Sequence, residues 1–266
     1  MADLARAFEP RPLEIAIIPN LSARTLFTAY EPMRRYLETR IGRPVKFYTA
    51  PNFYTYFKRT VHGDYDVIIC PPHFAWAGQQ EAGYVPLVQY RQELKSLLIV
   101  HDGSSISRLE DLRGATISAP DVLALATMKA MRTLRENNLR RNIEVVIRDY
   151  ASHNSAALAV QQREVAAAIV GSGPYRIMPE QFRKGTHVVL DFGGVPNATF
   201  MAHPRLGSHV IEQLKSALLD FADKTEEGKA FMARYQYDGF RVVGKNELHA
   251  MAEYTEEAKR IVEAHP

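Results

Sequence analysis

Short apolar runs alternate with amphipathic stretches through the first 85 residues. Three runs rich in β-branched residues have the pattern of buried parallel strands, and they are Leu13–Pro19, Val45–Thr49 and Asp66–Cys70. Each run is followed by apolar residues at helical spacing, in residues 25–41, 53–63 and 73–83. The order β-α-β-α-β-α predicts a parallel sheet with three loops at its carboxyl edge.

A second series of elements follows a pair of strand-like runs. Residues 84–91 and 95–101 have the spacing of a hairpin, and Asp102-Gly103 marks a turn after them. The pattern then predicts helices at 108–112, 122–137, 154–163 and 174–182, and strands at 115–118, 143–148, 165–170 and 188–191. Residues 198–202 resemble a strand, and the tail from residue 206 is mostly helical.

Two series of this kind predict two α/β lobes, each a mainly parallel sheet flanked by helices. We expect one lobe from residues 12–98 with 199–266 and the other from 99–198, with connections near Leu98–Gly103 and Asp191–Thr199. Two connections between two lobes leave a cleft that closes around a ligand by a hinge.

Composition excludes several classes of protein. The chain has 266 residues, 46% hydrophobic and 24% charged, as in globular domains. Its net charge of +3 is too small to indicate nucleic-acid binding. No apolar run approaches the roughly 18 residues of a membrane span, and a single cysteine excludes an internal disulfide.

The segment from Asp66 to Trp76 carries the most distinctive chemistry. A buried strand ends at Pro71-Pro72 and brings Cys70 and His73 to the carboxyl edge of the sheet, where open α/β sheets bind ligands. Alternatively, Cys70 is a small apolar filler and His73 a helix cap.

Several segments, in order and spacing, resemble the phosphate, phosphite and phosphonate-binding proteins of ABC importers, which are type II periplasmic binding proteins. The matching segments are Pro32–Leu37, Ile41–Val45, Gly63–Val67, Leu109–Ala115 and His153–Val165. The resemblance covers roughly residues 13–218. It implies a two-lobe fold, hinge closure on a small-molecule or oxyanion ligand, an ABC permease as partner, no cofactor, and a monomer. It also implies a periplasmic location, with an export signal removed ahead of the polar segment Met1–Pro12.

One segment departs from that family's pattern. Family members have a hydroxyl-rich cluster at a helix amino terminus in the second lobe, which binds the phosphorus oxyanion. Here the corresponding segment is Ala119–Leu125, which has no hydroxyl group. Asp121 is a candidate N-cap whose charge opposes a dianion, while free N–H groups remain for an anion. We therefore expect an altered ligand site.

The candidate ligand-binding residues are those at the predicted carboxyl-edge loops and in the segments that resemble the family's ligand site. They are Asn20, Ser22, Asn52, Tyr54, Cys70, His73, Asp121, Val122, His153, Asn154, Ser172, Tyr175 and Asn197. We expect no catalytic residue and no metal ligand among them, since no paired metal-ligand spacing is present.

Three alternatives to an importer's binding protein stay open. A ligand-sensing protein could feed a histidine kinase, for example through thiol-dependent arsenite or oxyanion sensing by Cys70. A Cys70–His73 pair could act as a nucleophile and base in an enzyme. A transcriptional regulator would need a DNA-binding helix-turn-helix, for which Met1–Pro12 is too short.

Overall fold

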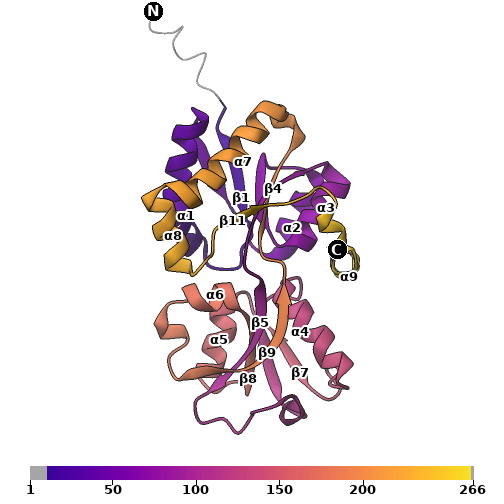
Figure 1. The fold of residues 1–266 in the computed structure, drawn as a ribbon. Helices are drawn as coiled ribbons and strands as arrows, with labels where there is room; N and C mark the ends of the chain where they lie inside the picture. Colours follow the sequence, from indigo (N-terminus) through magenta and orange to yellow (C-terminus); the bar gives the residue numbers. More distant parts are fainter. Residues whose placement is uncertain (1–10, 265–266) are drawn as a thin grey trace, which may run out of the picture.

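The computed structural model describes residues 11–264 and shows two α/β lobes, one above the other in Figure 1. The expectation for the segment Met1–Pro12 therefore falls almost entirely outside the described residues. Among residues 11–264, no helix has the length and apolar character needed to cross a membrane.

The first lobe is built on a six-stranded sheet with the order β11-β4-β10-β3-β1-β2. Its strands are β1 (Leu13–Ile17), β2 (Val45–Tyr48), β3 (Val67–Cys70), β4 (Val85–Tyr90), β10 (Thr199–Ala202) and β11 (Phe240–Val242). Strand β1 pairs in parallel with β2 and β3, whereas β10 runs antiparallel between β3 and β4.

Helices cover both faces of this sheet (Figure 1). They are α1 (Ala23–Ile41), α2 (Phe53–His62), α3 (Pro72–Ala82), α7 (Gly207–Lys224), α8 (Glu226–Tyr235) and α9 (Ala252–Glu263). Because side chains of a strand alternate between faces, Ile15 and Ile17 pack in the cluster formed with α1, α7 and α8. Ala16 packs on the opposite face with α2, α3 and α9.

The second lobe has a five-stranded sheet with the order β7-β6-β8-β5-β9. Its elements are β5 (Leu94–His101), β6 (Thr116–Ala119), α4 (Leu125–Glu136), β7 (Val146–Asp149), α5 (His153–Gln161), β8 (Ala167–Gly171), α6 (Ser172–Ile177) and β9 (Thr186–Val195). Strands β6, β7 and β8 are parallel, and β5 lies antiparallel between β8 and β9. Short 3₁₀ turns lie at Leu109–Leu112, Glu180–Phe182, Pro204–Leu206 and Glu247–Met251.

The predicted hairpin of residues 84–91 and 95–101 is wrong. Strand β4 belongs to the first sheet, whereas β5 pairs only with strands of the second. The first connection between the lobes is therefore 91–93 rather than Leu98–Gly103, and the second is 196–198, within the predicted Asp191–Thr199. The sequence of two adjacent strands does not show which other strands each will pair with, because strand pairing depends on tertiary context.

Local capping explains the position of two loops at the cleft. The Ser22 hydroxyl accepts a hydrogen bond from the Thr25 N–H at 3.2 Å and begins α1. The Asn52 side chain accepts one from the Thr55 N–H at 2.8 Å and begins α2. Gly42 ends α1 with a φ of 69°, a left-handed conformation that glycine adopts without strain.

Candidate functional site

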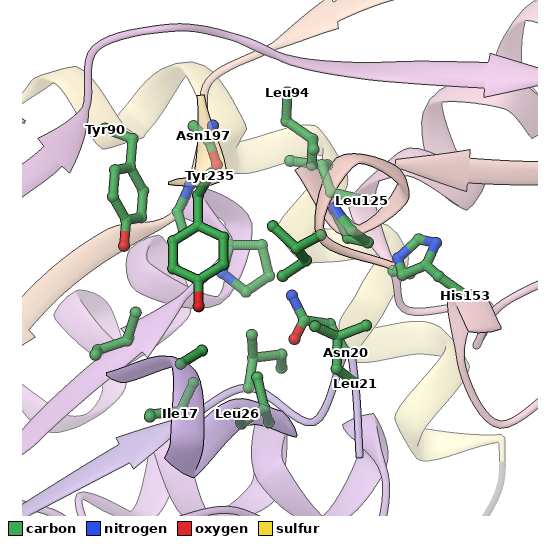
Figure 2. A pocket seen from close by; sticks show the side chains of 18 of the residues that line it. Ile17, Asn20, Leu21, Leu26, Tyr90, Leu94, Leu125, His153, Asn197 and Tyr235 are labelled. Atoms are coloured by element: carbon green, nitrogen blue, oxygen red, sulfur yellow. Dashed lines mark hydrogen bonds between the residues drawn. The ribbon is translucent and has the colours of Figure 1, made fainter. Parts of the chain in front are cut away.

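A cavity lies between the two lobes, around the carboxyl ends of β1 and β3 (Figure 2). The first lobe supplies Asn20, Tyr30 and Pro71, and the second supplies Leu125 and His153. The volume open to a water-sized molecule is about 80 Å³, several times the roughly 10–15 Å³ that one water needs. The cavity therefore has room for a small molecule.

The wall of this cavity is mainly aromatic and aliphatic. Six aromatic side chains contribute, and they are Tyr30, Phe53, Tyr90, Phe231, Tyr235 and Tyr237. Among the described residues that line the cavity there is no Asp, Glu, Lys or Arg, and no Ser or Thr. Polar side chains come only from the tyrosines, two asparagines and one histidine.

His153 is the first residue of α5 and is 4% exposed. Its Nδ1 accepts a hydrogen bond from the Gly171 N–H at 3.2 Å. Burial lowers the pKa of His153 to about 3, so the ring is neutral at ordinary pH. Since Nδ1 is the acceptor, the proton is assigned to Nε2, and His153 offers one N–H donor at the cavity.

Two asparagines supply further hydrogen-bonding groups. The Asn20 Oδ1 is buried and has no partner among the described residues, and Figure 2 shows this side chain in the middle of the site. The Asn197 Oδ1 accepts from the Ala198 N–H at 2.7 Å. A buried acceptor without a donor is costly, so Asn20 is suited to receive a donor from a ligand.

The tyrosines form a connected group on one side of the cavity. The Tyr30 and Tyr90 hydroxyls are 3.1 Å apart, and the Tyr90 ring stacks on Tyr237 with ring centroids 4.1 Å apart. Burial raises the pKa of Tyr30 to about 12. The phenols are therefore neutral and present apolar ring surface.

The amino terminus of α4 faces the cavity. Its N-cap is Ala124, whose side chain makes no capping bond, and Ala124, Leu125 and Ala126 all line the wall. The first α-helical bond is from the Met128 N–H to the Ala124 carbonyl at 3.0 Å. The N–H groups of the first turn precede that bond and are thus open to an acceptor.

Of the thirteen candidate residues, Asn20, His153 and Asn197 line this cavity. The other ten do not, and most have structural roles: Ser22 and Asn52 are caps. The Ser172 hydroxyl accepts from the Lys95 N–H at 3.0 Å. Tyr175 packs beside the α5 core.

Four other candidates also lie outside the cavity wall. Asp121 accepts a hydrogen bond from the Leu123 N–H at 2.9 Å, and Val122 packs against the core that joins the lobes. The Tyr54 hydroxyl and the Asn154 Oδ1 are buried without partners among the described residues.

Cys70 and His73 were expected at the ligand site, but neither lines the cavity. Cys70 is fully buried in the core, and burial raises the pKa of its thiol, which therefore stays protonated. His73 is also fully buried, and its Nε2 lies 3.1 Å from the Leu123 carbonyl of the second lobe. The prolines between them turn the chain so that His73 joins the two lobes.

Sequence reasoning missed the apolar wall. Tyr235 is the last residue of the tail helix α8 and Tyr237 follows it, and only the return of the tail to the first lobe brings them to the cleft. Leu125 lies in Ala119–Leu125, the segment that lacks the family's hydroxyl groups. An apolar residue at that helix start was therefore the one sequence signal for an apolar wall.

A shallow groove adjoins the cavity and shares Ala29, Ile177 and Tyr235 with it. Its wall also contains Arg24, Arg176 and Arg234, which form no ion pair with a carboxylate among the described residues. We call these three residues the arginine groove. Residues 11–264 contain no group of three His, Cys, Asp or Glu placed to hold a metal ion.

Comparison with known families now identifies the class of protein. The family model described as "ABC transporter, phosphonate, periplasmic substrate-binding protein" matches residues 15–248. The chain belongs to this family of periplasmic substrate-binding proteins, as its segments indicated. No curated protein sequence matches the chain.

Solved structures confirm the type II periplasmic-binding-protein fold. A binding protein component of an ABC phosphonate transporter from Pseudomonas aeruginosa is 18% identical with a TM-score of 0.81, covering 94% of this chain and 88% of that one. PhnD1 from Prochlorococcus marinus, solved with methylphosphonate, is 14% identical with a TM-score of 0.82, covering 94% and 99%. A histidine kinase sensor domain similar to periplasmic binding proteins is 14% identical with a TM-score of 0.59, covering 88% and 99%.

Proposed function

We propose that this protein is the solute receptor of an ABC importer, which closes its lobes on one small ligand and delivers it to a membrane permease. The observation that carries the proposal is the cavity itself, because both lobes and the second connection supply its wall. A ligand held there bridges the lobes and stabilises the closed form. In this proposal the protein acts as a monomer in the periplasm and performs no reaction.

The contacts between the lobes support closure around the site. The bond between His73 and the Leu123 carbonyl crosses the cleft at 3.1 Å. On the outer side, Arg132 of α4 pairs with Glu253 of α9 at 3.0 Å. Leu123, Leu125 and Met128 join the core of the first lobe. A hinge that opens the cleft has to separate these contacts, so they belong to the closed form.

A second candidate function is a sensor that reports ligand binding to a histidine kinase, which would use the same closure. The similarity to the fold of a histidine kinase sensor domain supports this candidate. Its thiol-dependent form loses support, because the Cys70 thiol is buried and protonated. Burial of the same thiol also removes support for a Cys-His enzyme, which needs an accessible thiolate.

The test is a thermal-shift screen with phosphate, phosphite, methylphosphonate and butanamide. A ligand at 100 times its Kd adds about 2.7 kcal/mol, which raises the melting temperature by several degrees in a chain of this size. The variant Leu125→Trp fills the cavity and should abolish the shift, whereas Ile143→Trp, at a residue 67% exposed on the second lobe, should keep it. A shift that survives Leu125→Trp would contradict the proposal, and so would a screen without any shift.

A further inference from the structure

We infer that the ligand of this site is a small uncharged molecule, with an apolar body, one carbonyl-type oxygen and one N–H or O–H donor. This inference rests on the proposed function, and it names a ligand class different from the phosphorus oxyanions named for the family. Four features of the cavity support it.

The first feature is the absence of a counter-charge. No cationic side chain lines the cavity within the described chain, and His153 is buried and neutral. An ion that leaves water for a wall of Leu, Ile and aromatic rings loses much of its hydration free energy. The wall has four tyrosine hydroxyls but no paired cation and no Ser or Thr hydroxyl within the described chain, so it does not repay that cost for a dianion.

The second feature is the side chain at the start of α4. The free N–H groups there can still bind an oxygen atom, but Leu125 and Ala126 offer methyl groups beside them instead of hydroxyls. Asp121 lies just before the helix and accepts from the Leu123 N–H at 2.9 Å. Its carboxylate offsets the positive end of the helix, which disfavours a second negative charge.

The third feature is the balance of donors and acceptors. Beside the hydroxyls of four tyrosines, the cavity offers N–H donors from the start of α4 and from Nε2 of His153. These N–H groups match one carbonyl oxygen. Within residues 11–264 the buried Asn20 Oδ1 has no donor, and it matches an N–H or O–H of the ligand. A phosphonate dianion has only acceptors, so it could use the NH₂ end of the Asn20 amide but would leave the Oδ1 without a donor.

The fourth feature is size. An apolar cavity of about 150 Å³ holds benzene, and this one measures about 80 Å³. The ligand is therefore no larger than benzene, at most about six non-hydrogen atoms. Carboxamides and similar polar compounds with a short alkyl chain have this size and this pattern of donors and acceptors.

The arginine groove offers the competing interpretation, an amphiphilic anion whose head group lies outside the cavity. Arg24 and Arg234 are exposed, so water already satisfies them. Arg176 donates to the Gln236 carbonyl at 3.2 Å. The groove therefore does not require an anion, and the experiment separates the two cases.

The experiment is calorimetric titration of the whole protein with three probes of similar length: butanamide, butanoate and propylphosphonate. We expect butanamide to bind at least tenfold more tightly than either anion. Its affinity should be constant from pH 5.5 to 8.5, because neither the probe nor His153 changes charge there. The affinity of propylphosphonate would change over that pH range, because its second acid proton dissociates within it.

Two variants test the named contacts. Asn20→Ala removes the acceptor and should weaken butanamide about five- to tenfold, whereas Asn246→Ala, on the exposed surface, should change nothing. Leu125→Ser restores a hydroxyl at the start of α4 and should raise the affinity for propylphosphonate relative to butanamide. If Leu125→Ser does not fold, Asn20→Ala and the pH profile still decide the question.

A preference for propylphosphonate or butanoate overturns the ligand class. A preference for butanoate that disappears in Arg176→Gln would place the head group in the arginine groove. In both cases the proposed function stands, because a solute still binds in the cleft. Failure of all three probes also overturns the ligand class, and the proposed function falls as well only if the thermal-shift screen finds no ligand.

Discussion

Two buried histidines make the stability of the protein depend on pH. His73 and His153 are 0% and 4% exposed. Burial lowers the pKa of each to about 3, whereas both titrate near 6.5 in the unfolded chain. The folded state therefore resists protonation that the unfolded state accepts.

The sign and size follow from that difference. A histidine with a lowered folded pKa contributes its full stability above pH 6.5, and the contribution falls as the pH drops from 6.5 toward 3. One pH unit is worth about 1.4 kcal/mol for each group. At pH 5 each histidine therefore lowers the free energy of unfolding by about 2 kcal/mol, and the pair lowers it by about 4 kcal/mol. Carboxylates with lowered pKa, such as Glu31 and Glu144 at about 2, act mainly at lower pH.

The assay is urea unfolding at pH 7 and pH 5. His73→Gln keeps an N–H that can donate to the Leu123 carbonyl. Because glutamine does not titrate, the decrease in the free energy of unfolding from pH 7 to pH 5 should be smaller by about 2 kcal/mol in this variant. His209→Gln, at an exposed residue of α7, is the control and should leave the loss unchanged. The reasoning is refuted if His73→Gln and His153→Gln both retain the full loss of the parent protein.

Two further predictions concern buried groups in the first lobe. Cys70 should react with a thiol reagent in the native protein at least a hundredfold more slowly than in the unfolded chain, because its sulfur is fully buried and protonated; equal rates would contradict this burial. Asp66 is 2% exposed and pairs with Arg43 and Arg205 at 3.5 and 3.1 Å, so Asp66→Ala should cost about 3–5 kcal/mol in urea unfolding. Asp64 lies two residues away with a side chain that is 37% exposed, so Asp64→Ala should cost less than about 1 kcal/mol, and equal losses would refute the role of burial.

The periodic parts of the chain could be predicted from sequence, because local rules decide them. Gly42 ends α1 and Asn52 begins α2 as capping chemistry requires. Strand β11, only three residues long, carries no pattern of its own and was missed. Helix α4 begins at Leu125 rather than Val122, because Asp121 holds the preceding turn instead of capping the helix.

The candidate site was predicted in part. Asn20 and His153 lie at carboxyl-edge loops and Asn197 in the second connection, where topology alone puts them beside the cleft. Cys70 has the same topology, yet its side chain points into the core, because the alternation of a strand decides the face and the loop does not reveal it. The aromatic wall depends on contacts between distant segments, such as Tyr90 with Tyr237, which periodicity does not report.

The most direct test of solute binding between the lobes is their separation in solution. Labels on Ile143→Cys in the second lobe and Lys224→Cys in the first report the distance between the lobes by electron paramagnetic resonance, while the buried Cys70 stays unlabelled. We predict that butanamide, or whichever probe binds, narrows the distance distribution to a single closed form, and that Leu125→Trp abolishes this response. A distribution that is identical with and without every bound probe would contradict closure around a ligand.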